Sequence, residues 1–196
     1  MEASHFLIIY ILVTHTLTSG MWWAAGSWMG LSRRASKHWM LSSACFGIGL
    51  LLTVLYADSL DTVQWMMAGL LVVVGAVSLR RGMQTFLKLP ETACEHALVT
   101  LVAVGFALIV ALPMGWRGGG MAACTAATAW VLGRLALECF RPLRAEFGPE
   151  TAATHATLMG LVVLTFTVTA FALTVPETPS PWRQLPRDMV YQWLVM

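Results

Sequence analysis

The stretch Trp65–Leu89 reads WMMAGLLVVVGAVSLRRGMQTFLKL and determines how the rest of the chain can be arranged. The eighteen residues 62–79 carry no charge, and Arg80 and Arg81 follow them directly. A helix of about 20 apolar residues crosses the hydrocarbon core of a bilayer, and cytoplasmic loops collect Lys and Arg. We therefore predict a membrane span that runs from outside to inside and ends at the two arginines.

The composition of the whole chain indicates a membrane protein. Hydrophobic residues make up 58% and charged residues 11% of the 196 residues, against roughly 25% charged in a soluble domain. The mean hydropathy is +0.71. The net charge of +2 is too small to indicate a nucleic-acid partner. We predict an all-α, polytopic membrane helix bundle that forms a single transmembrane domain, 1–196.

Uncharged runs alternate with charged loops along the chain and predict six spans in three helical hairpins. These spans are 6–31, 39–57, 62–79, 92–113, 119–137 and 152–175. Nine of the twelve Lys and Arg fall in the predicted cytoplasmic loops, so the distribution of positive charge places both termini outside the cytoplasm. We expect the membrane to be the inner membrane of a bacterium, with both termini in the periplasm. The last eight residues, MVYQWLVM, look like the beginning of a seventh span.

The fifth span has an unusual composition. It is rich in Ala, Thr and Cys and follows three consecutive glycines, 118–120. Each Gly costs about 1 kcal/mol inside a helix, so the triplet predicts a flexible turn. Small side chains let helices approach closely, and we expect this helix to be surrounded by protein. Two pairs with four-residue spacing are candidate packing positions: Gly26 with Gly30, and Ala122 with Ala126.

Basic residues near the predicted cytoplasmic surface have two interpretations. They are Arg33, Arg34, Arg80, Arg81 and Lys88. The favoured interpretation is that they orient the protein and contact anionic lipid headgroups, at about 1 kcal/mol each. The alternative is that the paired arginines bind a cytoplasmic anion. Most of the nine tryptophans lie near predicted helix ends, as in the interfacial belts of membrane proteins.

Candidate ligand-binding residues are few. His96 and His155 are each expected about one turn inside a different helix, with Cys94 and Glu95 at similar depth. Two histidines at matched depth can ligate haem or a metal ion. No recognised ligand spacing accompanies them, and the favoured interpretation is that they are polar residues at helix starts. We predict no cofactor and keep haem or a metal as the alternative.

Catalytic motifs are not apparent in the sequence. It has no glycine-rich phosphate loop, serine elbow, CxxC or His-Glu-x-x-His pattern, so no catalytic residue is predicted. The predicted spans carry no acidic residue at mid-membrane, which argues against a proton-coupled transporter.

The segment Trp39–Pro90 resembles the N-terminal membrane module that precedes GGDEF domains in many proteobacterial diguanylate cyclases. An aromatic-led helix with glycines, a short acidic turn and a helix ending in arginines, Gly and Phe carry the resemblance. The matching positions are Trp39, Gly47, Gly49, Gly69, Gly75, Arg80, Arg81, Gly82, Phe86 and Pro90. The resemblance implies a sensory or regulatory module that often dimerises and passes a signal to a cytoplasmic cyclase making cyclic di-GMP.

The sequence departs from that family by containing no GGDEF or other output domain. We expect either a part of a longer chain or a module that acts alone. The leading hypothesis is a sensory or regulatory membrane module, non-catalytic in itself, which contacts lipid and forms a homodimer or a larger complex. The alternatives are an accessory structural subunit of a membrane complex, and a redox subunit that binds haem or a metal.

Overall fold

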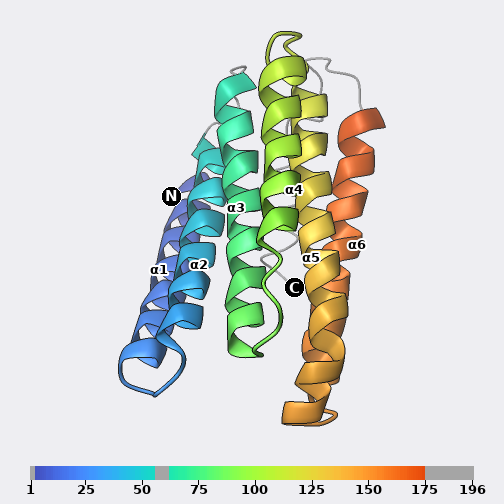
Figure 1. Cartoon of the computed structure of the whole chain (residues 1–196). Helices are drawn as coiled ribbons and strands as arrows, with labels where there is room; N and C mark the ends of the chain where they lie inside the picture. Colours follow the sequence, from blue (N-terminus) through green and yellow to red (C-terminus); the bar gives the residue numbers. More distant parts are fainter. Residues whose placement is uncertain (1–2, 56–61, 175–196) are drawn as a thin grey trace.

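A computed structural model describes residues 3–55 and 62–174 as a bundle of long helices (Figure 1). The helices are α1 (Ala3–Ser27), α2 (Arg33–Leu55), α3 (Thr62–Phe86), α4 (Ala93–Phe106), α5 (Arg117–Phe147) and α6 (Thr151–Thr174), with a π-helical segment η1 (Ala107–Ala111) continuing α4. Within the described residues, six helices are long and apolar enough to cross a membrane. This confirms the predicted all-α architecture with six helices of spanning length, while the side on which each end lies stays a prediction. The predicted external turn at 57–61 and the seventh span at 189–196 lie outside the described residues.

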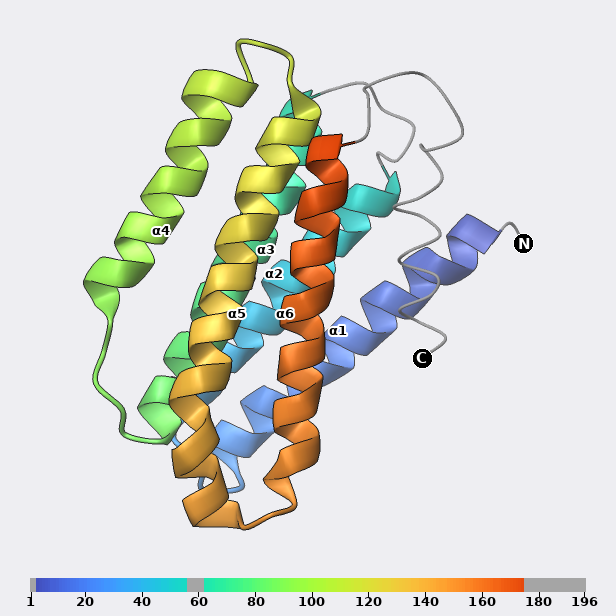
Figure 2. The same ribbon diagram turned by 90° about the vertical axis from the view of Figure 1, so that its right-hand side faces the viewer.

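The connections α1–α2, α3–α4 and α5–α6 lie at the same end of the bundle, the lower end in Figure 1. We call this the basic end, because it carries Arg33, Arg34, Lys37, Arg80, Arg81, Lys88, Arg134, Arg141 and Arg144. Helix α5 lies between α4 and α6 in both ribbon views (Figures 1 and 2). The broadest contacts join α2 to α3, α5 to α6, α1 to α2 and α3 to α5, so α4 is attached at the periphery.

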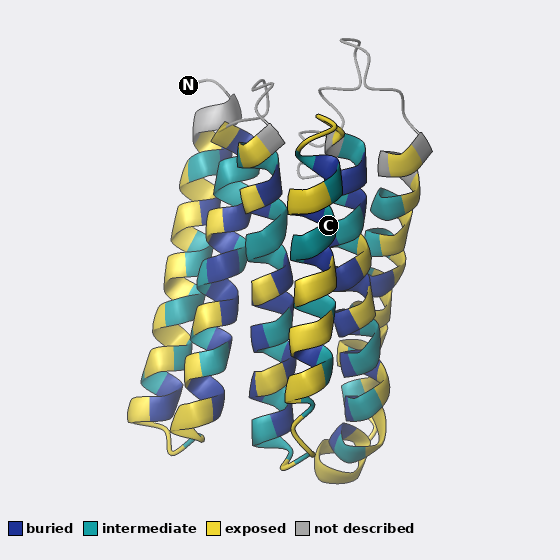
Figure 3. Cartoon of the chain, turned by 45° about the horizontal axis from the view of Figure 1, so that its top comes forward, coloured by how far each residue is buried: buried dark blue, intermediate teal, exposed yellow. Residues whose placement is uncertain are grey.

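Helix α5 forms the centre of the packed core. Half of the residues in its most apolar stretch are buried (50%), against 6% in α6. The small-residue helix therefore has the largest buried share of the six, although one side of it, with Trp130 and Leu137, is exposed. Its buried Val131 and Leu135 pack with Ala76 of α3 and Val162 of α6. Buried positions gather on the faces that the helices turn toward one another, and exposed positions follow the outward faces (Figure 3).

The helices continue past the charged residues at which the sequence predicted their ends. Helix α3 reaches Phe86, and α5 reaches Phe147, so the predicted loop beginning near residue 138 is wrong. Charge limits how far a helix lies in hydrocarbon, but it does not break the backbone hydrogen bonds that define the helix. Pro142 lies inside α5 and removes one such bond, while the buried neighbours Cys139 and Leu143 hold this turn against the core.

The glycine triplet is also helical. Helix α5 begins at Arg117, so residues 118–120 form its first turn and the predicted flexible turn is wrong. A side chain at Gly119 would collide with the indole of Trp116, and a Cβ at Gly120 would lie 3.4 Å from both Met66 and Ala111. The triplet therefore allows close packing at the start of α5, which offsets the conformational cost of glycine.

The predicted packing pairs are each half right. A Cβ on Gly26 would lie 2.8 Å from the Cβ of Ser36, so this glycine does permit close contact between α1 and α2. Gly30 lies in the turn after α1, with φ at +75°. On α5, Ala122 is buried and Ala126 is exposed, so only the first of these two alanines packs inside the bundle.

Candidate functional site

Arg80 connects three helices at the basic end. Its side chain is fully buried (0% exposed). Its NH1 and NH2 donate hydrogen bonds to Oε1 and Oε2 of Glu95 on α4, at 3.1 and 2.9 Å. Its Nε and NH2 donate to Oε2 and Oε1 of Glu138 on α5, at 3.0 and 2.6 Å. One guanidinium of α3 thus holds a carboxylate from each of two neighbouring helices.

A second arginine balances the charge of this group. The Nε of Arg134 donates to Oε1 of Glu95 at 3.2 Å, and its NH2 lies 3.2 Å from Oε1 of Glu138. The indole Nε1 of Trp130 also donates to Oε1 of Glu95, at 3.1 Å. Two arginines and two glutamates give no net charge, which is the form in which ionic groups are tolerated away from water.

A chain of polar side chains continues from the carboxylates to a histidine. The Nε2 of Gln84 donates to Oε2 of Glu138 at 3.2 Å and to Oγ1 of Thr92 at 3.0 Å. Oγ1 of Thr92 lies 3.4 Å from Nε2 of His96. His96 is 2% exposed, and its Nδ1 has no hydrogen-bond partner. We call the connected residues the Arg80 cluster: Arg80, Gln84, Thr92, Glu95, His96, Trp130, Arg134 and Glu138.

Helical spacing explains why these residues meet. Arg80 and Gln84 are four residues apart on α3, and Trp130, Arg134 and Glu138 follow one another at the same interval on α5. Residues four apart lie on the same face of a helix. That interval is visible in the sequence, but a span predicted to end at residue 137 leaves Glu138 in a loop, so the cluster was not predicted.

Two predictions are corrected by the Arg80 cluster. The prediction that Arg80 contacts lipid headgroups is wrong, because its side chain is buried between α3, α4 and α5. The second concerns Glu138, which was assigned to a loop and lies within the membrane-span candidate Gly118–Phe147, while Glu95 lies in the first turn of α4. The paired carboxylates do not behave as isolated intramembrane acids, because both accept hydrogen bonds from Arg80.

The remaining basic residues of the prediction are exposed. Arg33, Arg34, Arg81 and Lys88 all have exposed side chains, and their contact with lipid stays a prediction. Arg34 pairs with Glu91 at 2.9 Å, with both side chains at least 60% exposed. Such pairs contribute little to stability, in contrast to the buried pairs of Arg80.

The structure does not bring together the two histidines proposed as metal or haem ligands. His96 lies on α4 and His155 on α6, with α5 between these helices (Figure 2). The ring of His155 packs on Phe140 instead, with centroids 4.5 Å apart. Cys94 is exposed, and Glu95 is bound to arginines. Among residues 3–55 and 62–174, no group of three or more His, Cys, Asp and Glu is arranged to hold a metal ion.

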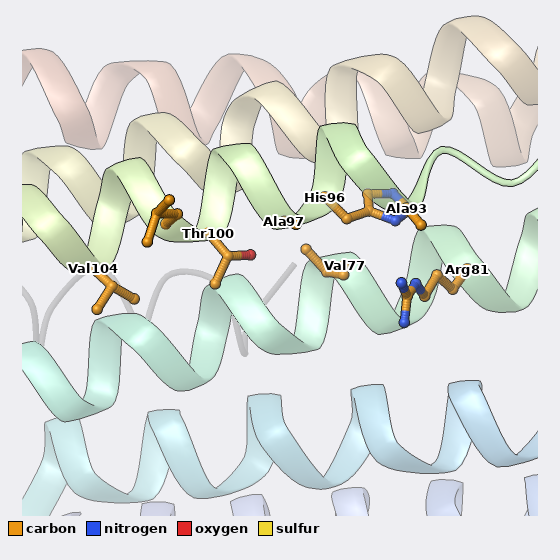
Figure 4. A pocket seen from close by; sticks show the side chains of 8 residues that line it. Val77, Arg81, Ala93, His96, Ala97, Thr100 and Val104 are labelled. Carbon is orange, nitrogen blue, oxygen red and sulfur yellow. The ribbon is translucent and has the colours of Figure 1, made fainter.

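A pocket of about 410 Å³ lies between α3 and α4, beside the Arg80 cluster. Its lining comprises Val77, Arg81, Ala93, His96, Ala97, Thr100, Leu101 and Val104. His96 and Arg81 lie at the end next to the α3–α4 connection, and Val104 lies at the opposite end (Figure 4). The pocket is thus an apolar groove with a cation and a polar ring at one end.

The positions that carry the resemblance to GGDEF-associated modules include a close contact between α2 and α3. Trp39 is buried, and its ring lies 4.5 Å from that of Trp22 and 5.5 Å from that of Phe86. A side chain at Gly82 would collide with the indole of Trp39. Trp39 is therefore a packing residue of the helix bundle.

Comparison with known proteins yields no match: no protein-family model, curated protein or solved structure matches this chain. The function is therefore argued from the Arg80 cluster and the adjoining pocket.

Proposed function

We propose that this chain is a sensory or regulatory membrane module, non-catalytic in itself, in which α4 changes its position relative to α3 and α5. One observation carries the proposal: α4 is attached through the Arg80 cluster more than through apolar contacts. Of its fourteen residues only His96 and Ala103 are buried. Glu95, in its first turn, binds Arg80, Trp130 and Arg134.

This mode of attachment favours two discrete arrangements of α4. Segments with few buried apolar contacts lie at the low-stability end of a protein and supply its moving elements. The far end of α4 passes into the π-helical segment Ala107–Ala111, and such segments occur frequently at functional sites. An ionic clamp at one end and a π-helical segment at the other make α4 the element that a signal would reposition.

The resemblance of Trp39–Pro90 to modules that precede GGDEF domains supports signalling as the class of function. Under this proposal the recipient of the signal is a cyclase that makes cyclic di-GMP. The chain acts in the inner membrane of a bacterium, as a homodimer or within a larger assembly. Its basic end faces the cytoplasm, in keeping with the excess of Lys and Arg there.

Distances between spin labels test the motion of α4. The labels are placed at Leu98→Cys on α4 and Leu137→Cys on α5, which are 61% and 68% exposed. The background carries Cys94→Ser, since Cys45, Cys124 and Cys139 are buried. The reference pair is Met67→Cys on α3 with Leu137→Cys. Both pairs are measured in lipid nanodiscs, with and without Glu95→Gln.

If α4 changes its position, we expect two distances between the labels of the α4–α5 pair. The fraction of molecules with the less frequent distance should increase when Glu95→Gln weakens the contact with Arg80 and Arg134. The reference pair should give one distance, unchanged by the substitution. A single α4–α5 distance in both backgrounds would contradict the proposal. That result would instead support the alternative of a rigid accessory subunit of a larger membrane complex.

A further inference from the structure

We propose that the groove between α3 and α4 binds an anionic phospholipid, with the headgroup phosphate between His96 and Arg81 and an acyl chain along α4. This inference deepens the proposed function, because it names a ligand class that would act on α4. Only the effect of binding on α4 rests on the proposed function. The binding site itself depends on the geometry of the groove.

His96 uses one of its two ring nitrogens within the Arg80 cluster. Nε2 of Gln84 donates to Oγ1 of Thr92, and this hydroxyl lies 3.4 Å from Nε2 of His96. In the tautomer in which the hydroxyl donates to Nε2, the neutral ring carries its proton on Nδ1.

The Nδ1 of His96 is a buried polar atom without a hydrogen-bond partner. Five such side-chain atoms occur in the described part of the chain, those of Ser36, Trp39, Gln64, Gln84 and His96. Of these residues only His96 lines the groove. His96 is thus the one buried polar residue lining the groove that retains an unused hydrogen-bonding nitrogen.

The charge around the groove selects an anion. Arg81 lines the same end as His96 (Figure 4), and within the described residues its guanidinium forms no ion pair with a carboxylate. The neighbouring Glu95 and Glu138 are held by Arg80 and Arg134. An anionic oxygen at this end would therefore meet one cation, Arg81, that no described carboxylate compensates, beside the ring of His96.

The shape of the groove fits an acyl chain. Its lining beyond Arg81 and His96 is apolar except for Thr100. From Ala93 to Val104 a helix rises about 16 Å, close to half the thickness of the hydrocarbon core, about 15 Å. Arg81 and His96 both lie at the basic end, where headgroups are expected (Figure 4). Basic pockets between membrane helices are known to bind acidic headgroups in this way.

Native mass spectrometry of the whole protein tests the assignment. The probes are phosphatidylglycerol, phosphatidylcholine with the same acyl chains, and inorganic phosphate. The variants are Arg81→Gln, the groove-filling Thr100→Phe, and Arg141→Gln as a control. Arg141 is an exposed arginine of the same basic end that does not line the groove.

We expect the native protein to retain phosphatidylglycerol roughly tenfold over phosphatidylcholine, because both carry the phosphate but the choline cation of the second would lie among the arginines of the basic end. Arg81→Gln should remove this preference, Thr100→Phe should abolish retention of either lipid, and Arg141→Gln should change neither. Equal retention of the two lipids would overturn the proposal, as would equal losses in Arg81→Gln and Arg141→Gln. Displacement of the lipid by millimolar inorganic phosphate would identify a simple anion site and also overturn it. If the lipid binds but the spin-label distances show no movement of α4, the lipid site is supported and the proposed regulatory function is contradicted.

Discussion

Arg80 and Glu95 are joined by two parallel hydrogen bonds, from NH1 to Oε1 at 3.1 Å and from NH2 to Oε2 at 2.9 Å. This fork geometry is specific to the planar guanidinium. Arg80 is fully buried, whereas the next residue, Arg81, is exposed. Two adjacent arginines of one sequence motif therefore have different roles, one inside the bundle and one at its surface.

Lysine should preserve the stability of the protein at the exposed position Arg81 but not at the buried position Arg80. Arg80→Lys keeps the charge and loses the fork, so it should lower the free energy of unfolding by about 2–3 kcal/mol. Arg81→Lys should change it by less than about 0.5 kcal/mol. Thermal unfolding in detergent compares the two variants. Equal losses in both would mean that the fork does not hold the helices together.

The contact between Gly82 and Trp39 predicts an unusual response to alanine. Gly82→Ala should destabilise the protein by about 1–3 kcal/mol, because the added methyl group has no space beside the indole. Gly20→Ala in α1 is the matched control, since nothing lies within 4 Å of its Cβ position. It should stabilise the helix by roughly 0.5–1 kcal/mol. A stabilising effect at both positions would show that α2 and α3 are farther apart than described.

Much of the fold was predictable, because it depends on local patterns. Six apolar runs of adequate length predicted the helices, and the small residues of the fifth run predicted its burial. The Arg80 cluster depends instead on contacts between distant segments: Glu138 lies 58 residues from Arg80 along the chain. A single sequence contains no signal that two residues so far apart along the chain are in contact. The interval of four between Trp130, Arg134 and Glu138 was the available signal, and it would have indicated one polar helix face.

The excess of Lys and Arg at the basic end predicts which side of the membrane it faces. Glu91→Cys lies in the α3–α4 connection and Met114→Cys lies in the turn at the opposite end; both positions are at least 60% exposed. In a Cys94→Ser background, a membrane-impermeant maleimide should label Met114→Cys in intact bacteria. Glu91→Cys should react only after permeabilisation. The reverse pattern would show that the chain is inserted the other way round.

We infer that the buried ion network, rather than surface charge, holds α4 to α3 and α5. The most direct measurement compares Glu95→Gln with Glu91→Gln by thermal or denaturant unfolding in the same detergent. Glu95→Gln leaves the buried Arg80 with one carboxylate and should cost about 3 kcal/mol. Glu91→Gln breaks only an exposed pair with Arg34 and should cost less than about 1 kcal/mol. Equal and small losses in the two variants would contradict the claim.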